Sequence, residues 1–171
     1  RQAGEAAALE SSRVASLSQT LALAAGIPAE QVTIDRDHRR ASAAAAPLPG
    51  AMLQSYRILE GRVAGQTEGW DVAIVPPQST FPVVAFGNDV DSLDAVAREA
   101  VLTSAWAARR WNVRALIVPG LPTGELDNPN LSQRRALAIA RLLQEQGVAA
   151  APGATAGQSF RLSPAQNETA P

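Results

Sequence analysis

The chain has 171 residues, of which 46 % are hydrophobic and 18 % charged, and its formal net charge is -1. This length suits one or two compact domains with a buried core. The near-neutral net charge gives no electrostatic case for nucleic-acid binding, which usually needs a clustered basic surface. The absence of cysteine excludes disulfides, thiolate metal sites and a cysteine nucleophile, and no apolar run approaches the roughly 20 residues of a membrane-spanning helix.

Residues 1–75 predict a small α+β portion. Apolar residues at helical spacing favour a helix over residues 5–25, and Gly26 is a typical stop signal. The β-branched run at residues 31–34 favours a short strand.

A mixture of charge, alanine and proline follows, and we expect an exposed linker over residues 35–52. The next two runs, residues 55–63 and 69–75, are rich in strand-forming residues and predict a β-hairpin.

The second half of the chain predicts strands alternating with helices, which is typical of a sheet covered by helices. The fold class expected for the whole chain is therefore α/β, an α+β sandwich. The predicted elements are a strand at 83–86, a helix at 91–111, a strand at 113–120, a helix from 131 that ends at Gly147, a weak strand at 159–162 and a flexible tail at 163–171.

Enzyme signatures are missing from the sequence. The single histidine, His38, lies in the predicted linker, so a Ser-His-Asp triad or a histidine metal cluster is not expected. No glycine-rich phosphate loop occurs. Acidic pairs such as Asp89 with Asp91 are read as loop and capping residues rather than as acid–base groups. We therefore expect a non-catalytic protein without cofactor or metal.

The start of the last predicted helix is unusual, because Arg134 and Arg135 fall in its first turn, where the helix dipole disfavours positive charge. Such a pair is either a harmless surface feature or a device that holds an anion. The segment before and around it is rich in helix-capping residue types: Asp127, Asn128, Asn130 and Ser132.

The pattern from Asn128 through Leu131, Ser132, Arg135 and Ala136 resembles the signature of the OmpA C-terminal-like family, the peptidoglycan-binding domain of OmpA, Pal and MotB. The resemblance covers residues 81–162 and includes the order of strands and helices. It implies a βαβαβ domain in which Arg135 binds the carboxylate of diaminopimelate in peptidoglycan.

The ligand site implied by this resemblance comprises Arg135, Asn128, Asp127, Ser132 and Thr123. A guanidinium offers a fork of donors to a carboxylate, and the free N–H groups of the helix start add to the same site. Two other uses of Arg135 remain open: pairing with a nearby acid such as Asp127, or exposure to solvent. For Arg134 we expect exposure to solvent.

One part of the family pattern is absent. Members carry Gly-[His/Tyr]-Thr-Asp after the second strand, whereas here Leu121 and Pro122 follow Gly120, and no aspartate follows Thr123. Half of the ligand clamp is therefore missing. A scaffold that acts through protein contacts is accordingly placed ahead of a peptidoglycan anchor.

A second resemblance concerns the N-terminal half. Residues 12–34 and 55–70 are similar to CpaD-type pilus assembly proteins, which are envelope lipoproteins, although the cysteine common near their tryptophan is absent. Together the two resemblances imply a periplasmic component of an envelope, pilus or secretion assembly, associated with the outer membrane through an N-terminal anchor that has been removed. The expected partners are proteins of that machinery, with peptidoglycan as the alternative.

The two halves also share a faint internal repeat. Its first copy has Leu9, Arg13, Leu17 and Leu21, and its second copy has Leu131, Arg135, Ile139 and Leu143 at the same spacing. Either two alanine-rich amphipathic helices are similar by chance, or the N-terminal portion is a diverged copy of the second domain.

Overall fold

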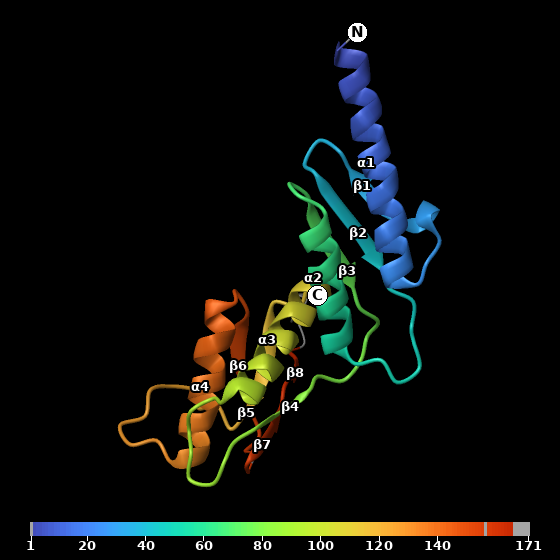
Figure 1. Cartoon of the computed structure of the whole chain (residues 1–171). Helices are drawn as coiled ribbons and strands as arrows, with labels where there is room; N and C mark the ends of the chain where they lie inside the picture. The colour runs from blue at the N-terminus through green and yellow to red at the C-terminus, as the bar shows by residue number, and fades with distance from the viewer. Residues whose placement is uncertain (1, 156, 166–171) are drawn as a thin grey trace, which may run out of the picture. The chain divides into compact units, whose positions relative to one another are not determined.

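The computed structural model describes residues 2–155 and 157–165, and the protein has a mixed α/β architecture of helices and small sheets (Figure 1). The chain divides into two compact units, residues 1–78 and residues 79–171. We call them the N-terminal unit and the C-terminal unit. Within the described ranges, no helix combines the length and apolar character needed to cross a membrane.

The N-terminal unit is a three-stranded sheet with two long helices. Its strands run in the order β1-β2-β3, with β1 antiparallel and β3 parallel to β2. The elements are α1 (Gln2–Ala25), the short 3-10 helix η1 (Ala29–Gln31), β1 (Thr33–Asp35), β2 (Arg40–Ala44), α2 (Leu53–Gln66) and β3 (Asp71–Val75).

Helix α1 confirms the predicted N-terminal helix. Val14, Leu17 and Leu21 are buried at helical spacing. The helix ends where Gly26 takes a positive φ of 71°, and the amide of Ile27 donates to the carbonyl of Ala22 over 3.0 Å. The strand predicted at 31–34 is confirmed as β1, displaced by two residues at its start.

The linker expected over residues 35–52 is wrong in its first half, because it contains β2, the central strand of the sheet. Ala41 and Ala43 face the core and are at most 2 % exposed. Alanine has a weak strand propensity, so the alternation gave no strong signal. It forms a strand here because neighbours on both sides supply its hydrogen bonds.

The predicted hairpin is also wrong, because its first strand is helix α2, whereas its second strand is confirmed as β3. Leu53, Tyr56 and Val63 are buried along one face of α2. A parallel pair such as β2 and β3 needs a long crossover, which a tight hairpin does not provide. The carboxylate of Glu60 fixes the crossover by accepting from the amide of Ile74 over 2.9 Å.

The C-terminal unit confirms the predicted alternation of strands and helices. The weak strand predicted near residue 160 is confirmed as β7, while β6 was missed. The elements are β4 (Val83–Ala85), α3 (Ala95–Arg110), β5 (Ala115–Pro119), α4 (Leu131–Glu145), β6 (Ala149–Gly153), β7 (Ser159–Arg161) and β8 (Ser163–Pro164).

One short segment links the two small sheets of this unit, β4-β7 and β6-β5-β8. Strands β7 and β8 are separated only by Leu162; β7 pairs antiparallel with β4, and β8 pairs antiparallel with β5. Strand β6 pairs parallel with β5 on its other side. Phe160 and Leu162 are buried. The flexible tail expected from residue 163 begins instead with β8, and residues 166–171 lie outside the described part of the chain.

Candidate functional site

Helix α4 begins with a capping box. The side chain of Asn130 accepts from the amide of Gln133 over 2.9 Å, and the side chain of Gln133 accepts from the amide of Asn130 over 2.9 Å. This reciprocal pair satisfies two of the amides that a helix start leaves free. Of the four capping-type residues at this helix start, Asn130 is the N-cap.

Arg135 is directed into the unit and is only 4 % exposed. Its Nε donates to the carbonyl of Val90 over 2.7 Å, and its Nη2 donates to the carbonyl of Gly87 over 2.8 Å. The guanidinium also lies 5.3 Å from the ring centroid of Phe86. One edge of the guanidinium fork therefore holds two backbone carbonyls of the loop between β4 and α3.

Arg134 is exposed, as predicted, and it also contacts the same loop from outside. Its Nε donates to Asp91 Oδ2 over 3.0 Å, and its Nη1 donates to the carbonyl of Pro129 over 2.9 Å. Both partners of the ion pair are about half exposed. The two first-turn arginines thus fasten residues 87–91 to α4, and we call this set of bonds the arginine clasp.

The loop held by the clasp has a defined conformation. Asp89 has a positive φ of 58°, and Asn88 Oδ1 accepts from Gln158 Nε2 over 2.9 Å. The rings of Phe86 and Phe160 pack edge to face at 5.4 Å. These contacts connect the loop to the segment that leads into β7.

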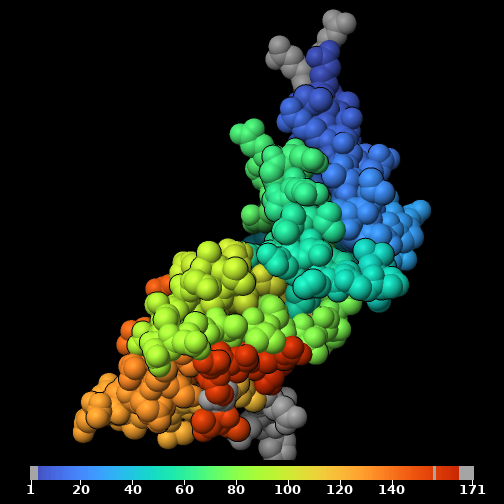
Figure 2. All heavy atoms as spheres, turned by 60° about the horizontal axis from the view of Figure 1, so that its bottom comes forward, coloured from blue at the N-terminus to red at the C-terminus, as the bar shows by residue number. Residues whose placement is uncertain are grey.

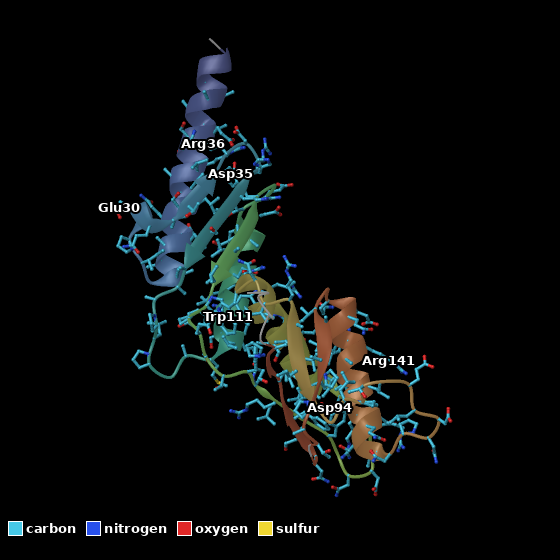
Figure 3. The ribbon with its side chains drawn as sticks, turned by 180° about the vertical axis from the view of Figure 1, so that it is seen from behind. Glu30, Asp35, Arg36, Asp94, Trp111 and Arg141 are labelled. Atoms are coloured by element: carbon cyan, nitrogen blue, oxygen red, sulfur yellow. The ribbon has the colours of Figure 1, made fainter. Side chains whose placement is uncertain are left out.

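Helix α3 starts shortly after this loop. Its N-cap is Asp94, whose Oδ1 accepts from the amide of Ala97 over 2.8 Å (Figure 3). A fixed loop and a capped helix start together determine where α3 begins on the sheet.

Three residues of the predicted ligand site are not joined to Arg135. Thr123, Asp127 and Asn128 are exposed, and within residues 2–155 and 157–165 no hydrogen bond or ion pair connects Arg135 to them. Ser132, the fourth, is half-buried. The partners that Arg135 does have, the carbonyls of Gly87 and Val90, carry no side-chain signature, and sequence reasoning missed them.

His38 belongs to the turn between β1 and β2, and Asp35, labelled in Figure 3, is the last residue of β1 before that turn. Its Nδ1 lies 2.8 Å from Asp35 Oδ2, and its amide donates to Asp35 Oδ1 over 3.2 Å. The side-chain hydrogen bond from His38, followed by the amide bond, holds the pKa of the Asp35 carboxyl below its usual value. The pair closes an exposed turn. Among the described residues, no three His, Cys, Asp or Glu side chains gather as a metal site requires.

The two helices that carry the internal repeat end alike but use their arginines differently. Gly26 after α1 and Gly147 after α4 both have a positive φ, of 71° and 79°. Arg13, which matches Arg135 in the repeat, is exposed.

Comparisons of the chain with protein families, with curated proteins and with solved structures find no match. The fold and the clasp therefore define the class: a two-unit α+β protein with a buried arginine at a helix start.

Proposed function

We propose that this protein is a non-catalytic scaffold of a bacterial envelope, pilus or secretion assembly, located in the periplasm and acting through contacts with other proteins of that machinery. The order of elements from β4 to α4, together with the sequence from Asn128 to Ala136, supports an OmpA-like ancestry of the C-terminal unit. The observation that carries the scaffold function is the internal use of Arg135.

A buried guanidinium that already donates to two carbonyls is poorly suited to capture a ligand. Binding a carboxylate with the same Nε–Nη2 edge would require both bonds to break, and two carbonyls would lose charged donors, which costs several kcal/mol by general estimates. The arginine stabilises the domain instead of serving as its ligand clamp. We therefore expect the binding surface elsewhere in the C-terminal unit.

An open sheet edge provides such a surface. In the described ranges, β6 pairs with β5 alone, so its outer side has backbone groups available to another strand. Pro152 limits this edge, because proline has no N–H to donate. The amide of Ala149 donates to the carbonyl of Arg114 in the direction of β5, and alternate residues of a strand direct their backbone groups to opposite sides. The outward-facing groups of β6 are therefore the N–H and carbonyl of Ala150 and the carbonyl of Pro152.

Peptidoglycan binding is the alternative function. The two carbonyl bonds do not use Nη1 of Arg135, and Asp127, Asn128 and Thr123 are exposed on the connection that precedes α4. A carboxylate that approached Nη1 would leave the clasp intact. This alternative predicts binding that depends on residues outside the clasp.

The first test separates the two functions by sedimentation of the purified protein with intact peptidoglycan sacculi. We expect the protein to remain in the supernatant, as does a double variant Asp127→Ala, Asn128→Ala. Sedimentation of the wild type that the double variant loses would overturn the scaffold proposal and establish the alternative. Arg135→Ala is unsuitable for this experiment, because loss of the clasp would also perturb the fold.

The second test looks for the protein partner in cells. A photoreactive amino acid replaces Ala149 or Ala151 in β6, and the control carries it at Arg141, which is exposed on α4. We expect cross-links to one envelope protein from the β6 positions and none from Arg141. If neither β6 position cross-links while the protein fractionates with the envelope, docking at this edge is wrong.

A further inference from the structure

The N-terminal unit contains an open cavity of about 690 Å³. Its walls are the middle of α1, the turn before β2 and the connection from α2 to β3. In Figure 2 the α2–β3 connection, in green, projects beside the blue atoms of α1. Small-molecule sites commonly have volumes of roughly 300–1,000 Å³, so the space suits a ligand of that size.

Two arginines line this cavity, Arg13 from α1 and Arg39 from the turn. Within the described part of the chain, neither guanidinium takes part in a hydrogen bond or an ion pair. This differs from Arg134 and Arg135, whose donors are used within the protein. Two guanidinium groups from different walls of one cavity are suited to hold a carboxylate between them.

The position of Arg39 is fixed by its backbone conformation and by the closeness of Gly69. Its φ is 50°, and its carbonyl accepts from the amide of Asp71 over 2.9 Å. Its Nη1 lies so close to Gly69 that a Cβ at that position would be 3.4 Å away. The guanidinium of Arg39 therefore lies against Gly69 in the α2–β3 connection. This contact restricts the side chain and keeps its guanidinium beside the cavity.

Two carboxylates, Glu10 and Glu68, line the same cavity. The four charges cancel, so a ligand with several phosphates would gain from the arginines but be repelled by the glutamates. A ligand that carries both a carboxylate and an ammonium group matches both signs. Trp70 is half-buried beside them and offers a flat apolar face for the rest of such a ligand.

We propose that this cavity binds an amino acid or a short peptide with free ends, that is, a zwitterion. Arg13 and Arg39 bind its carboxylate, Glu10 and Glu68 bind its ammonium group, and Trp70 packs against its side chains. The site goes beyond the proposed function, because it belongs to the N-terminal unit and uses neither the clasp nor the β6 edge. Docking of a protein partner at β6 can fail without affecting it, and the reverse also holds.

The test uses trialanine as the probe and follows the indole N–H signal of Trp70 in nitrogen-15 spectra of the whole chain. We compare the peptide with free ends, the N-acetylated form, the C-amidated form, and inorganic phosphate. Removal of either charged end is expected to weaken binding about tenfold, which is the typical size of one charge-assisted interaction. Phosphate is expected to leave the Trp70 signal unchanged at the same concentration.

Variants assign the two ends of the ligand. Arg13→Gln with Arg39→Gln should weaken the free peptide about tenfold or more and remove the difference between the free and the C-amidated form. Glu10→Gln with Glu68→Gln should remove the difference between the free and the N-acetylated form. Arg36→Gln is the matched control, because Arg36 is exposed in the same turn but does not line the cavity, and it should change nothing.

All substituted residues except the half-buried Glu10 are exposed, and the unchanged spectrum away from the cavity verifies folding of each variant. Absence of a Trp70 shift with every peptide would overturn the proposal. Stronger binding of phosphate than of trialanine, or equal binding of the free and the doubly blocked peptide, would also overturn it.

Discussion

Arg13 and Arg135 occupy matching positions in two similar helix sequences, yet they have opposite environments. Arg135 is buried and donates to two carbonyls, whereas Arg13 is exposed and faces an open cavity. The helices end with the same glycine geometry and the same return bond, from Ile27 to Ala22 in one case and from Val148 to Leu143 in the other, each 3.0 Å long. The spacing of the repeat therefore specifies the helix and its end, but not the use of its arginine.

The difference comes from what lies opposite each arginine. In the C-terminal unit, the loop after β4 directs the carbonyls of Gly87 and Val90 at the guanidinium, and these replace the water that burial removes. In the N-terminal unit, Arg13 lies in the middle of α1 on the wall of an open cavity, and no carbonyl of the described residues accepts a hydrogen bond from it. A charged group is buried only where partners exist, so the same residue is structural in one unit and available to a ligand in the other.

The largest expected effect is from Arg135→Ala. The substitution removes two charged donors from buried carbonyls, and we expect the free energy of unfolding to fall by roughly 2–4 kcal/mol. Arg13→Ala, its counterpart in the repeat, should change it by less than about 0.5 kcal/mol. Residue-resolved hydrogen exchange measures both changes in unfolding free energy: the amides of β5 report on the C-terminal unit and those of β2 on the N-terminal unit. Equal effects of the two substitutions would contradict the comparison.

The second prediction contrasts a crowded glycine with an open one. A Cβ at Gly153 in β6 would lie 2.5 Å from Ile117 Cγ2 and 3.3 Å from the carbonyl oxygen of Val118, so Gly153→Ala should destabilise the C-terminal unit by about 1–3 kcal/mol. Gly61 lies in α2 with nothing within 4 Å of such a Cβ. Gly61→Ala should stabilise the N-terminal unit by about 0.5–1 kcal/mol, since alanine is the better helix former. Denaturant titration of each variant gives both signs, and a stabilising Gly153→Ala would contradict the close packing of β6 on β5.

The third prediction concerns the capping box at the start of α4. Asn130→Ala removes an acceptor from the amide of Gln133 and should cost about 1 kcal/mol. Asn128→Ala, two residues earlier and exposed, should cost less than about 0.5 kcal/mol. Thermal unfolding of the two variants provides the measurement. A larger loss of stability for Asn128→Ala than for Asn130→Ala would show that Asn130 is not the N-cap of α4.

The smallest expected effect is a pH dependence in the β1–β2 turn. The folded pKa of Asp35 is lowered by His38, so the stability gained from this pair is present above the usual carboxyl pKa and is lost as pH falls through the lowered value. His38→Ala should raise the pKa of Asp35 toward its usual value. A carbon-13 NMR titration of the Asp35 carboxyl measures this, with Asp37, exposed in the same turn, as the internal control. An unchanged titration of Asp35 would show that His38 does not hold it.

The elements predicted from sequence are those with a strong local signal. Helices α1, α3 and α4 have apolar faces at helical spacing and clear ends, while β4 and β5 are apolar runs between turn residues. Two of the missed strands, β2 and β6, are built largely from alanine, which favours strands only when neighbours provide hydrogen bonds. Helix α2 was predicted as a strand because β2 was not recognised. Without β2 as a parallel partner of β3, nothing in the sequence required a helical crossover before β3.

The candidate site was predictable only in part, because only some of its residues have a local signal in the sequence. Two arginines in a first helical turn conflict with the helix dipole, and the sequence left open whether they are a surface feature or hold an anion. Neither alternative included the loop carbonyls that Arg135 contacts. The identity of the partner was not predictable, because a backbone carbonyl leaves no trace in the sequence. Arg134 shows the related difficulty: Asp91 lies far from it along the chain, and one aspartate among several gave no reason to pair the two.

The position of the segment 159–164 has a consequence for synthesis of the chain. The N-terminal unit has all three of its strands once Val75 has left the ribosome. In the C-terminal unit, β4 is made early but pairs with β7, and β5 also receives a partner, β8, from the same late segment. Until residues 159–164 emerge, β4 lacks its partner strand β7, and the apolar surface that Phe160 covers stays open to chaperones or to aggregation. The unit that carries the buried arginine is thus the one whose nascent chain needs protection for longest.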